Sequence, residues 1–179
     1  MKWFVPDREQ AGALPGRSCI EHIVALRLLF EFFRKKRTTT LFVLFVDFSK
    51  AYDRVPRTAL IRTLIQLGCS TVMLMAIVSM YKMNYSILGL ALITAVIGVR
   101  QGSPTSCFLF TVFVNTLIRN LKQCAPERYL GWLHCLMLID DTVLLATTWE
   151  SMREKLIVLQ NFCNESGMII NEKKTILCN

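Results

Sequence analysis

The sequence is poor in acidic residues, in histidine and in long apolar segments. Its 179 residues include 13 Asp and Glu against 21 Lys and Arg, and only two histidines, His22 and His134. Neither histidine stands in a metal-binding pattern with Cys or His, so we take both as structural. The longest charge-free apolar run, residues 87–99, is shorter than the roughly 20 residues that a membrane-spanning helix needs. A zinc site of that kind and a membrane span are therefore not expected.

Paired cysteines are missing as well. The seven cysteines never form a C-x-x-C motif, and an odd number without a pairing pattern indicates buried thiols in a reducing, intracellular compartment. Nucleus and cytoplasm fit this equally well. Residues 1–10 mix Lys, Asp, Arg and Glu, which does not fit a secretory or transit peptide.

What the sequence has in abundance is apolar and basic residues. Hydrophobic residues make up 53% of the chain and the formal net charge is +8. The length suits a single domain with a sizeable core, and the apolar content indicates surface that further segments should cover. The positive charge fits a polyanionic partner such as nucleic acid, because Lys and Arg displace counterions from phosphates. Many basic proteins never bind nucleic acid, so the charge alone does not decide this.

Apolar spacing and capping residues predict five helices. The first starts at Ser18, which forms an S-x-x-E capping box with Glu21. Its apolar positions, expected to face the core, are Ile20, Ile23, Leu26, Phe30 and Phe33. Its basic end, residues 34–37, could be a solvated helix end or a phosphate contact. The other helices are expected between Pro56 and Gly68, over residues 71–81, from Ser103 to about Gln123, and over residues 150–165 before Gly167.

Strands are expected between these helices. Residues 40–46 are β-branched and aromatic without polar interruption, which is typical of a strand buried on both faces. Residues 86–97 predict a hairpin that turns at Gly89, and a short β pair is expected at the end of the chain. Two apolar runs, residues 132–139 and 142–147, predict a hairpin joined by Asp140 and Asp141. The irregular alternation indicates an α+β fold with an antiparallel sheet.

Two adjacent aspartates between such apolar strands are an unfavourable arrangement. Like charges about 4 Å apart repel by roughly 4 kcal/mol at an effective dielectric constant of 20, and a divalent cation would remove that repulsion. Asp47 follows the strand over residues 40–46. If this strand lies beside the hairpin, Asp47 meets Asp140 at one edge and the cluster suits two Mg²⁺ ions. The alternative is ordinary: Asp-Asp pairs are common in turns, and Asp47 could cap the next turn.

Five blocks of the sequence resemble the reverse transcriptases of non-LTR (LINE-type) retrotransposons, in that family's order. The stretch VDFSKAYD (residues 46–53) resembles motif A, GVRQGSP (98–104) motif B and DDTVLLA (140–146) motif C. The stretch GMIIN (167–171) with Lys174 and Thr175 resembles motif D, and QAG (10–12) with GRS (16–18) resembles the segment before motif A. One such block could arise by chance, whereas five in order span nearly the whole chain.

The resemblance implies a polymerase palm over residues 1–179, with an antiparallel sheet packed on helices and part of the fingers. The family's upstream fingers motifs and its thumb are expected to be absent. The implied activity is RNA-directed DNA polymerisation, with an RNA template, a DNA primer and dNTPs as partners. The implied cofactors are two Mg²⁺ ions, or Mn²⁺, held by Asp47, Asp140, Asp141 and the backbone carbonyl of Phe48.

The resemblance also implies a nucleotide pocket. Tyr52 would stack under the incoming sugar and exclude a 2′-hydroxyl, although an aromatic packed under a helix start would look the same. Gln101 and Gly102 would line the pocket, and a plain loop before a capped helix is the alternative. Lys174 would lie near the leaving pyrophosphate; a solvated lysine is the alternative.

The chain departs from the family pattern in the motif C hairpin. Leu138 stands where the family has Tyr or Phe, and Ile139 where it has Ala. The aromatic side chain usually contacts the primer end, so these changes leave the metal ligands but put primer positioning in question. A catalytically inactive, truncated nucleic-acid-binding relic of such an enzyme is therefore the second hypothesis.

Overall fold

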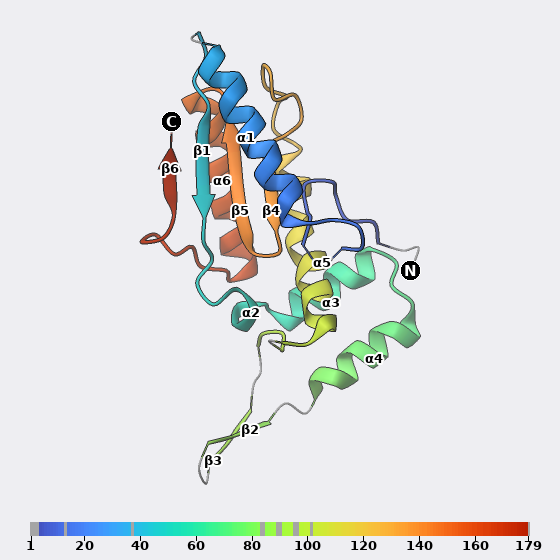
Figure 1. Ribbon diagram of the computed structural model, residues 1–179. Helices are drawn as coiled ribbons and strands as arrows, with labels where there is room; N and C mark the ends of the chain where they lie inside the picture. Colours follow the sequence, from blue (N-terminus) through green and yellow to red (C-terminus); the bar gives the residue numbers. More distant parts are fainter. Residues whose placement is uncertain are drawn as a thin grey trace.

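The computed structural model describes residues 4–12, 14–36, 38–82, 85–88, 91–94, 97–100 and 102–178. Helices and strands alternate irregularly along the chain (Figure 1). The helices are α1 (Cys19–Lys35), α2 (Ala51–Arg54), α3 (Arg57–Gln66), α4 (Thr71–Lys82), α5 (Pro104–Leu121) and α6 (Trp149–Ser166). The strands are β1 (Phe42–Val46), β2 (Tyr85–Leu88), β3 (Ala91–Thr94), β4 (Cys135–Leu138), β5 (Asp141–Ala146) and β6 (Ile176–Cys178).

Four strands form an antiparallel sheet in the order β4-β5-β1-β6, and β2 and β3 form a separate two-stranded sheet. Strand β1 lies inside the larger sheet, where Val46 pairs with Thr142 of β5 and Val43 pairs with Cys178 of β6. The expected α+β fold with an antiparallel sheet is confirmed. The hairpin expected over residues 86–97 is also present as β2 and β3, while Gly89 lies outside the described residues.

Helices cover both faces of the four-stranded sheet (Figure 1). Successive side chains of a strand point to opposite faces, and Val43 and Leu145 pack with Phe33 of α1 in one apolar cluster. Leu44 and Leu144 belong to the larger core, which includes residues of α3, α5 and α6. Burial on both faces explains the uninterrupted apolar run of β1. Phe45 is the exception, with an exposed fraction of 37%.

Helix α1 starts where the sequence predicts, but the prediction of its buried face is wrong. Ser18 is the N-cap residue without a side-chain capping bond, and Glu21 pairs instead with Arg17 at 2.7 Å. Of the residues expected to face the core, Phe33 is buried and Leu26 half-buried. The other three are exposed: Ile20, Ile23 and Phe30. Helix α1 carries apolar residues on all of its sides, including further exposed ones such as Val24 and Leu28. Spacing alone could therefore not identify the face that contacts the sheet.

The remaining helices agree with the predicted starts and ends. Pro56 and Ser103 are the N-cap residues of α3 and α5, and Gly167 ends α6 in the left-handed conformation with φ 67°. The short helix α2 lies in a segment for which the sequence predicts no helix. Across the described part of the chain, no helix is both long and apolar enough to span a membrane.

A buried ion pair joins α6 to the segment before β4. Lys155, which is fully buried, donates to the carboxylate of Glu127 and to the carbonyl of Leu145. Glu127 also accepts hydrogen bonds from the backbone N–H and the hydroxyl of Thr147. Burial by itself raises the pKa of Glu127, but the bonds from Lys155 and Thr147 outweigh this and leave the pKa lowered. The pair therefore holds Glu127 in its charged form inside the protein.

Replacing Lys155 with Met should lower the free energy of unfolding by about 3–5 kcal/mol, because it leaves the Glu127 carboxylate buried without a cation. The double variant Lys155→Met/Glu127→Gln should recover part of this loss. Urea denaturation measures both, with the exposed Lys35→Met as a control that changes stability by less than about 0.5 kcal/mol. A double variant no more stable than the single one would contradict this account of the pair.

Candidate active site

The β4–β5 hairpin presents two aspartates, although not as the sequence predicts. Leu138 pairs with Asp141, the first residue of β5, so the turn consists of Ile139 and Asp140. The prediction that Asp140 and Asp141 together join the strands is therefore wrong by one residue. Ile139 adopts φ 61°, the left-handed region that a two-residue hairpin turn requires. For a β-branched residue this conformation is strained.

Antiparallel pairing brings Asp47 to the same edge of the sheet. Asp47 directly follows Val46, whose partner on β5 is Thr142, the residue after Asp141. Burial raises the pKa of Asp140, and the negative charges of Asp141 and Asp47 raise it further. The three carboxylates thus lie close enough to interact electrostatically at one edge.

These acids do not form a complete metal site by themselves. Among the described residues, no group of three or more His, Cys, Asp or Glu side chains is arranged to hold a metal ion. Mg²⁺ commonly binds through one or two carboxylates and completes its coordination with water and substrate phosphates. Neighbouring carboxylates whose negative charges repel one another supply the oxygen ligands that Mg²⁺ prefers. The residues therefore fit Mg²⁺ as part of a shell that substrate completes.

Phe48 and the segment after α6 lie beside the acids. Asn171 N–H donates to the Asp47 carbonyl at 2.8 Å, and Ser49 N–H donates to the Ile169 carbonyl at 2.8 Å. In this antiparallel bridge between Phe48 and Ile170, the carbonyl of Phe48 points away from Ile170, because carbonyls alternate in direction along an extended strand. It therefore points to the side of the strand on which β5 lies.

Lys174 belongs to the same segment. Its neighbour Thr175 accepts a hydrogen bond from Asp47 N–H through Oγ1 at 3.4 Å, and the Lys174 side chain is exposed. The segment that contains Lys174 is therefore in contact with Asp47.

Tyr52 lies on α2 and packs against α5. Its ring stacks on Phe110 with centroids 4.9 Å apart and planes 13° from parallel, and its hydroxyl donates to Cys107 Sγ at 3.4 Å. Burial raises the pKa of Tyr52, and the contact with Cys107 and the charge of Asp140 raise it further. The hydroxyl therefore lies within electrostatic reach of Asp140.

The loop before α5 is hydrogen-bonded to α2 and to the loop after it. Gly98 N–H donates to the Val55 carbonyl at 2.9 Å, and Val99 N–H donates to the Tyr52 carbonyl at 2.8 Å. Gly98 has φ 84°, and a Cβ there would lie 2.8 Å from the Asp53 carbonyl oxygen. Only glycine suits this position. Gly102, shortly before the start of α5, is exposed with φ 80°, and Gln101 lies outside the described residues.

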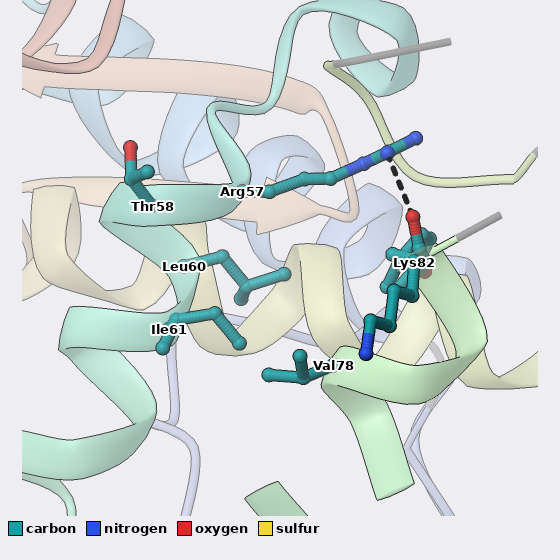
Figure 2. Close-up of a pocket in the computed structure, with 7 residues that line it drawn as sticks. Arg57, Thr58, Leu60, Ile61, Val78 and Lys82 are labelled. Carbon is teal, nitrogen blue, oxygen red and sulfur yellow. Dashed lines mark hydrogen bonds between the residues drawn. The ribbon is translucent and has the colours of Figure 1, made fainter. Parts of the chain in front are cut away.

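Arg57 is a residue of this region that the sequence did not reveal. Its guanidinium donates to the carbonyls of Gly98 at 3.0 Å, Ile97 at 3.2 Å and Tyr81 at 3.3 Å, and it lies over the Tyr81 ring. Figure 2 shows the side chain reaching from α3 to the end of α4. Arg57 thereby anchors the start of the loop that leads to Gly102. A lone arginine after proline carries no sequence signal for such a role.

The same arginine borders a pocket of about 370 Å³ between α3 and α4 (Figure 2). Leu60, Ile61 and Val78 supply its apolar wall, and Lys82 lies at its rim. None of the described candidate site residues lines this pocket. It therefore has no part in the acidic edge.

A family model described as reverse transcriptase (RNA-dependent DNA polymerase) matches residues 5–179. The chain belongs to the reverse transcriptase family. Its helices and antiparallel sheet are those of a reverse transcriptase palm, so the predicted fold is confirmed. The matching model does not distinguish the non-LTR type from other reverse transcriptases.

Solved telomerase structures resemble this reverse transcriptase chain in fold. Apo telomerase from Candida tropicalis aligns with a TM-score of 0.69 and 15% identity, over 96% of this chain and 33% of that one. Telomerase from Candida albicans, in complex with a TWJ fragment of telomeric RNA, aligns with a TM-score of 0.66 and 15% identity, over 90% of this chain and 30% of that one. The chain thus spans about a third of these telomerase chains, and such low identity supports the fold alone.

Replacing Asp140 with Asn should stabilise this reverse transcriptase chain, by about 0.5–2 kcal/mol, because it removes a partly buried charge repelled by two others. The pKa of Asp140 is raised in the folded state, so folding favours its protonated form and the charge penalty disappears as pH falls through that pKa. The advantage of the Asn variant should therefore shrink in acid. Thermal melting at several pH values measures this, and an Asn variant less stable than the wild type at neutral pH would contradict it.

Proposed function

We propose that the chain carries the catalytic centre of an RNA-directed DNA polymerase of the non-LTR (LINE) retrotransposon type. The observation that carries this proposal is the strand register that brings Asp47, Asp140 and Asp141 to one sheet edge, with Tyr52 within electrostatic reach of Asp140. Membership of the reverse transcriptase family supports the polymerase activity. The non-LTR assignment rests on the five sequence blocks and their order.

In this proposal, Asp47 and Asp140 hold two divalent cations, Mg²⁺ or Mn²⁺, with support from Asp141 and the Phe48 carbonyl. When bound, such ions activate the primer 3′-hydroxyl and neutralise charge on the triphosphate. The β1–β5 pairing supports this arrangement of the carboxylates, and so do the hydrogen bonds that the backbone of Asp47 makes with Asn171 and Thr175. These contacts orient the ligands before substrate arrives, which is the main protein contribution in phosphoryl transfer.

The nucleotide pocket is assigned to Tyr52, Gln101, Gly102 and Lys174. Tyr52 is supported from beneath by Phe110, so its ring is rigid enough to stack under the incoming sugar and to exclude a 2′-hydroxyl. Gly102 has no side chain and lets the backbone approach the substrate. Lys174 is exposed and directly precedes Thr175, which binds Asp47. This position suits a contact with the leaving pyrophosphate.

The partners proposed for this centre are an RNA template, a DNA primer and dNTPs, in a reducing intracellular compartment. We propose that residues 1–179 form the palm with part of the fingers, and that polymerisation requires further fingers and thumb segments. The short span relative to the telomerase chains supports this. A non-catalytic nucleic-acid-binding relic is the second candidate, and it is favoured by Leu138 and Ile139, which replace the aromatic and the small residue of the family pattern.

Primer extension on an RNA template with Mg²⁺ tests the first proposal. The 179-residue chain should extend a primer weakly at most, because a loosely positioned substrate can cost about a hundredfold in rate. Any extension should vanish in the double variant Asp140→Asn/Asp141→Asn. Mg²⁺ should also raise the melting temperature of the wild type but not of that variant, since only a ligand that binds the folded state stabilises it.

The outcomes separate the two candidates. Extension as fast as that of a complete polymerase, and abolished in the variant, would show that no further segment is required. Mg²⁺ that leaves the wild-type melting temperature unchanged, together with no detectable extension, would reject the catalytic proposal in favour of the relic.

Binding of nucleic acid should fall steeply with salt, whichever candidate is right. Lys173 and Lys174 are exposed next to the acidic edge, whereas Arg34 and Lys35 end α1 at the opposite end of the sheet (Figure 1). The double variant Lys173→Gln/Lys174→Gln should therefore reduce the slope of log affinity against log salt concentration by about 1 for each phosphate that is no longer neutralised. Fluorescence anisotropy measures the slope.

The matched control is Arg34→Gln/Lys35→Gln, which removes the same charge and should leave the slope unchanged. Equal effects of the two variants would contradict binding at the acidic edge, and salt-independent binding would contradict any role for phosphates in recognition.

A further inference from the structure

The segment before α1 lies along the outer side of the hairpin that carries Asp140. Ala11 N–H donates to the Met137 carbonyl at 2.9 Å, and Met137 N–H donates to the Glu9 carbonyl at 2.8 Å. Gln10 and Met137 therefore form a parallel bridge at the edge of β4. The side chain of Gln10 is fully buried there, with an exposed fraction of 0%.

The amide of Gln10 contacts one residue of the hairpin turn through both of its polar atoms. Oε1 accepts hydrogen bonds from Ile139 N–H at 2.9 Å and from Gly12 N–H at 2.7 Å. Nε2 donates to the Ile139 carbonyl at 3.3 Å. With the amide turned over, the NH₂ group would face two N–H donors, so only this orientation satisfies all three groups.

Ile139 is the residue whose conformation needs such support. Its φ of 61° is unfavourable for a β-branched side chain, and strained residues persist only where the surroundings determine them. Gln10 binds the N–H of the peptide group before Ile139 and the C=O of the peptide group after it. That second peptide group contains the backbone nitrogen of Asp140, so its orientation sets the direction in which the Asp140 side chain leaves the turn.

The space for Ile139 depends on the neighbouring glycine. A Cβ on Gly12 would lie 2.4 Å from the Ile139 backbone nitrogen and 2.4 Å from its Cγ1. Such distances do not occur between packed atoms, so any side chain at residue 12 would displace the turn. Gln10, through its hydrogen bonds, and Gly12, through its lack of a side chain, thus both stabilise the turn that contains Asp140.

We infer that Gln10 is a positioning residue for the catalytic hairpin: its amide holds Ile139 in the left-handed conformation and thereby aims the Asp140 carboxylate at the cation. The inference rests on the proposed function, in which Asp140 is a metal ligand. The contact between Gln10 and the turn can be tested separately from metal binding.

Gln10→Met removes the polar atoms and keeps an unbranched side chain of similar length. The matched control is Asn115→Leu, because Asn115 is another buried amide that binds the same N-terminal segment, through Asp7 N–H at 3.0 Å and Asp7 Oδ2 at 2.9 Å. Both variants should lower the melting temperature. Only Gln10→Met should affect the hairpin turn.

Amide hydrogen exchange in the 179-residue chain measures the turn. In Gln10→Met the protection of the Ile139 and Gly12 amides should fall by about tenfold or more, the effect of losing one such hydrogen bond on local opening. In Asn115→Leu it should stay as in the wild type. If Gln10→Met does not fold, hydrogen exchange in the wild type alone tests the inference. An Ile139 amide that exchanges as fast as the amide of an exposed turn would overturn it.

Binding of Mn²⁺ alone, measured by electron paramagnetic resonance, gives the second readout. Gln10→Met should weaken it by about 10–100-fold, as removal of groups that orient metal ligands does, and Asn115→Leu should not. Equal losses in both variants, or unchanged Mn²⁺ affinity in Gln10→Met, would reject the positioning role while leaving the proposed function intact. If Mn²⁺ binds wild type and Asp140→Asn equally, the proposed function fails, and the exchange result then decides whether Gln10 holds the turn.

Discussion

The antiparallel pairing of β1 with β5 is the constraint on which the candidate active site depends. Val46 pairs with Thr142, and this register places Asp47 beside the aspartates of the hairpin. A shift by one residue would turn every side chain of β1 to the other face of the sheet. Because β1 has partners on both sides and apolar clusters on both faces, such a shift would disrupt its pairing with two strands and the packing of both clusters. The burial of apolar residues therefore determines where the first carboxylate lies.

Two unfavourable features of the protein meet at this edge. Asp140 carries a charge that burial and two neighbouring carboxylates disfavour, and Ile139 is held in a strained backbone conformation. The buried charge of Lys155, in contrast, is paired with Glu127. Strain and charge repulsion persist where the surrounding structure determines them, and they commonly mark functional sites. The well-packed body of the palm thus stabilises a chain whose acidic edge, the proposed cation site, is itself unfavourable.

Much of the fold was predictable because its signals are local. Pro56, Ser103 and Gly167 act on the backbone of their own neighbours, so the ends of α3, α5 and α6 follow from the sequence. The face of α1 did not follow, because apolar residues surround that helix and only contact with the sheet selects Phe33 and Leu26. The exact turn between β4 and β5 did not follow either, since it depends on the pairing of Leu138 with Asp141.

By itself, the sequence determined the α+β class, the family and the identity of the acids that carry the proposed chemistry, since these depend on composition, short motifs and their order. Tertiary structure alone decided which groups support those acids. Gln10 and Ile139 are 129 residues apart, and Arg57 and Gly98 are 41 residues apart. Hydrogen bonds at such separations leave no periodic or local pattern in the chain, because they exist only after the apolar core has brought distant segments together.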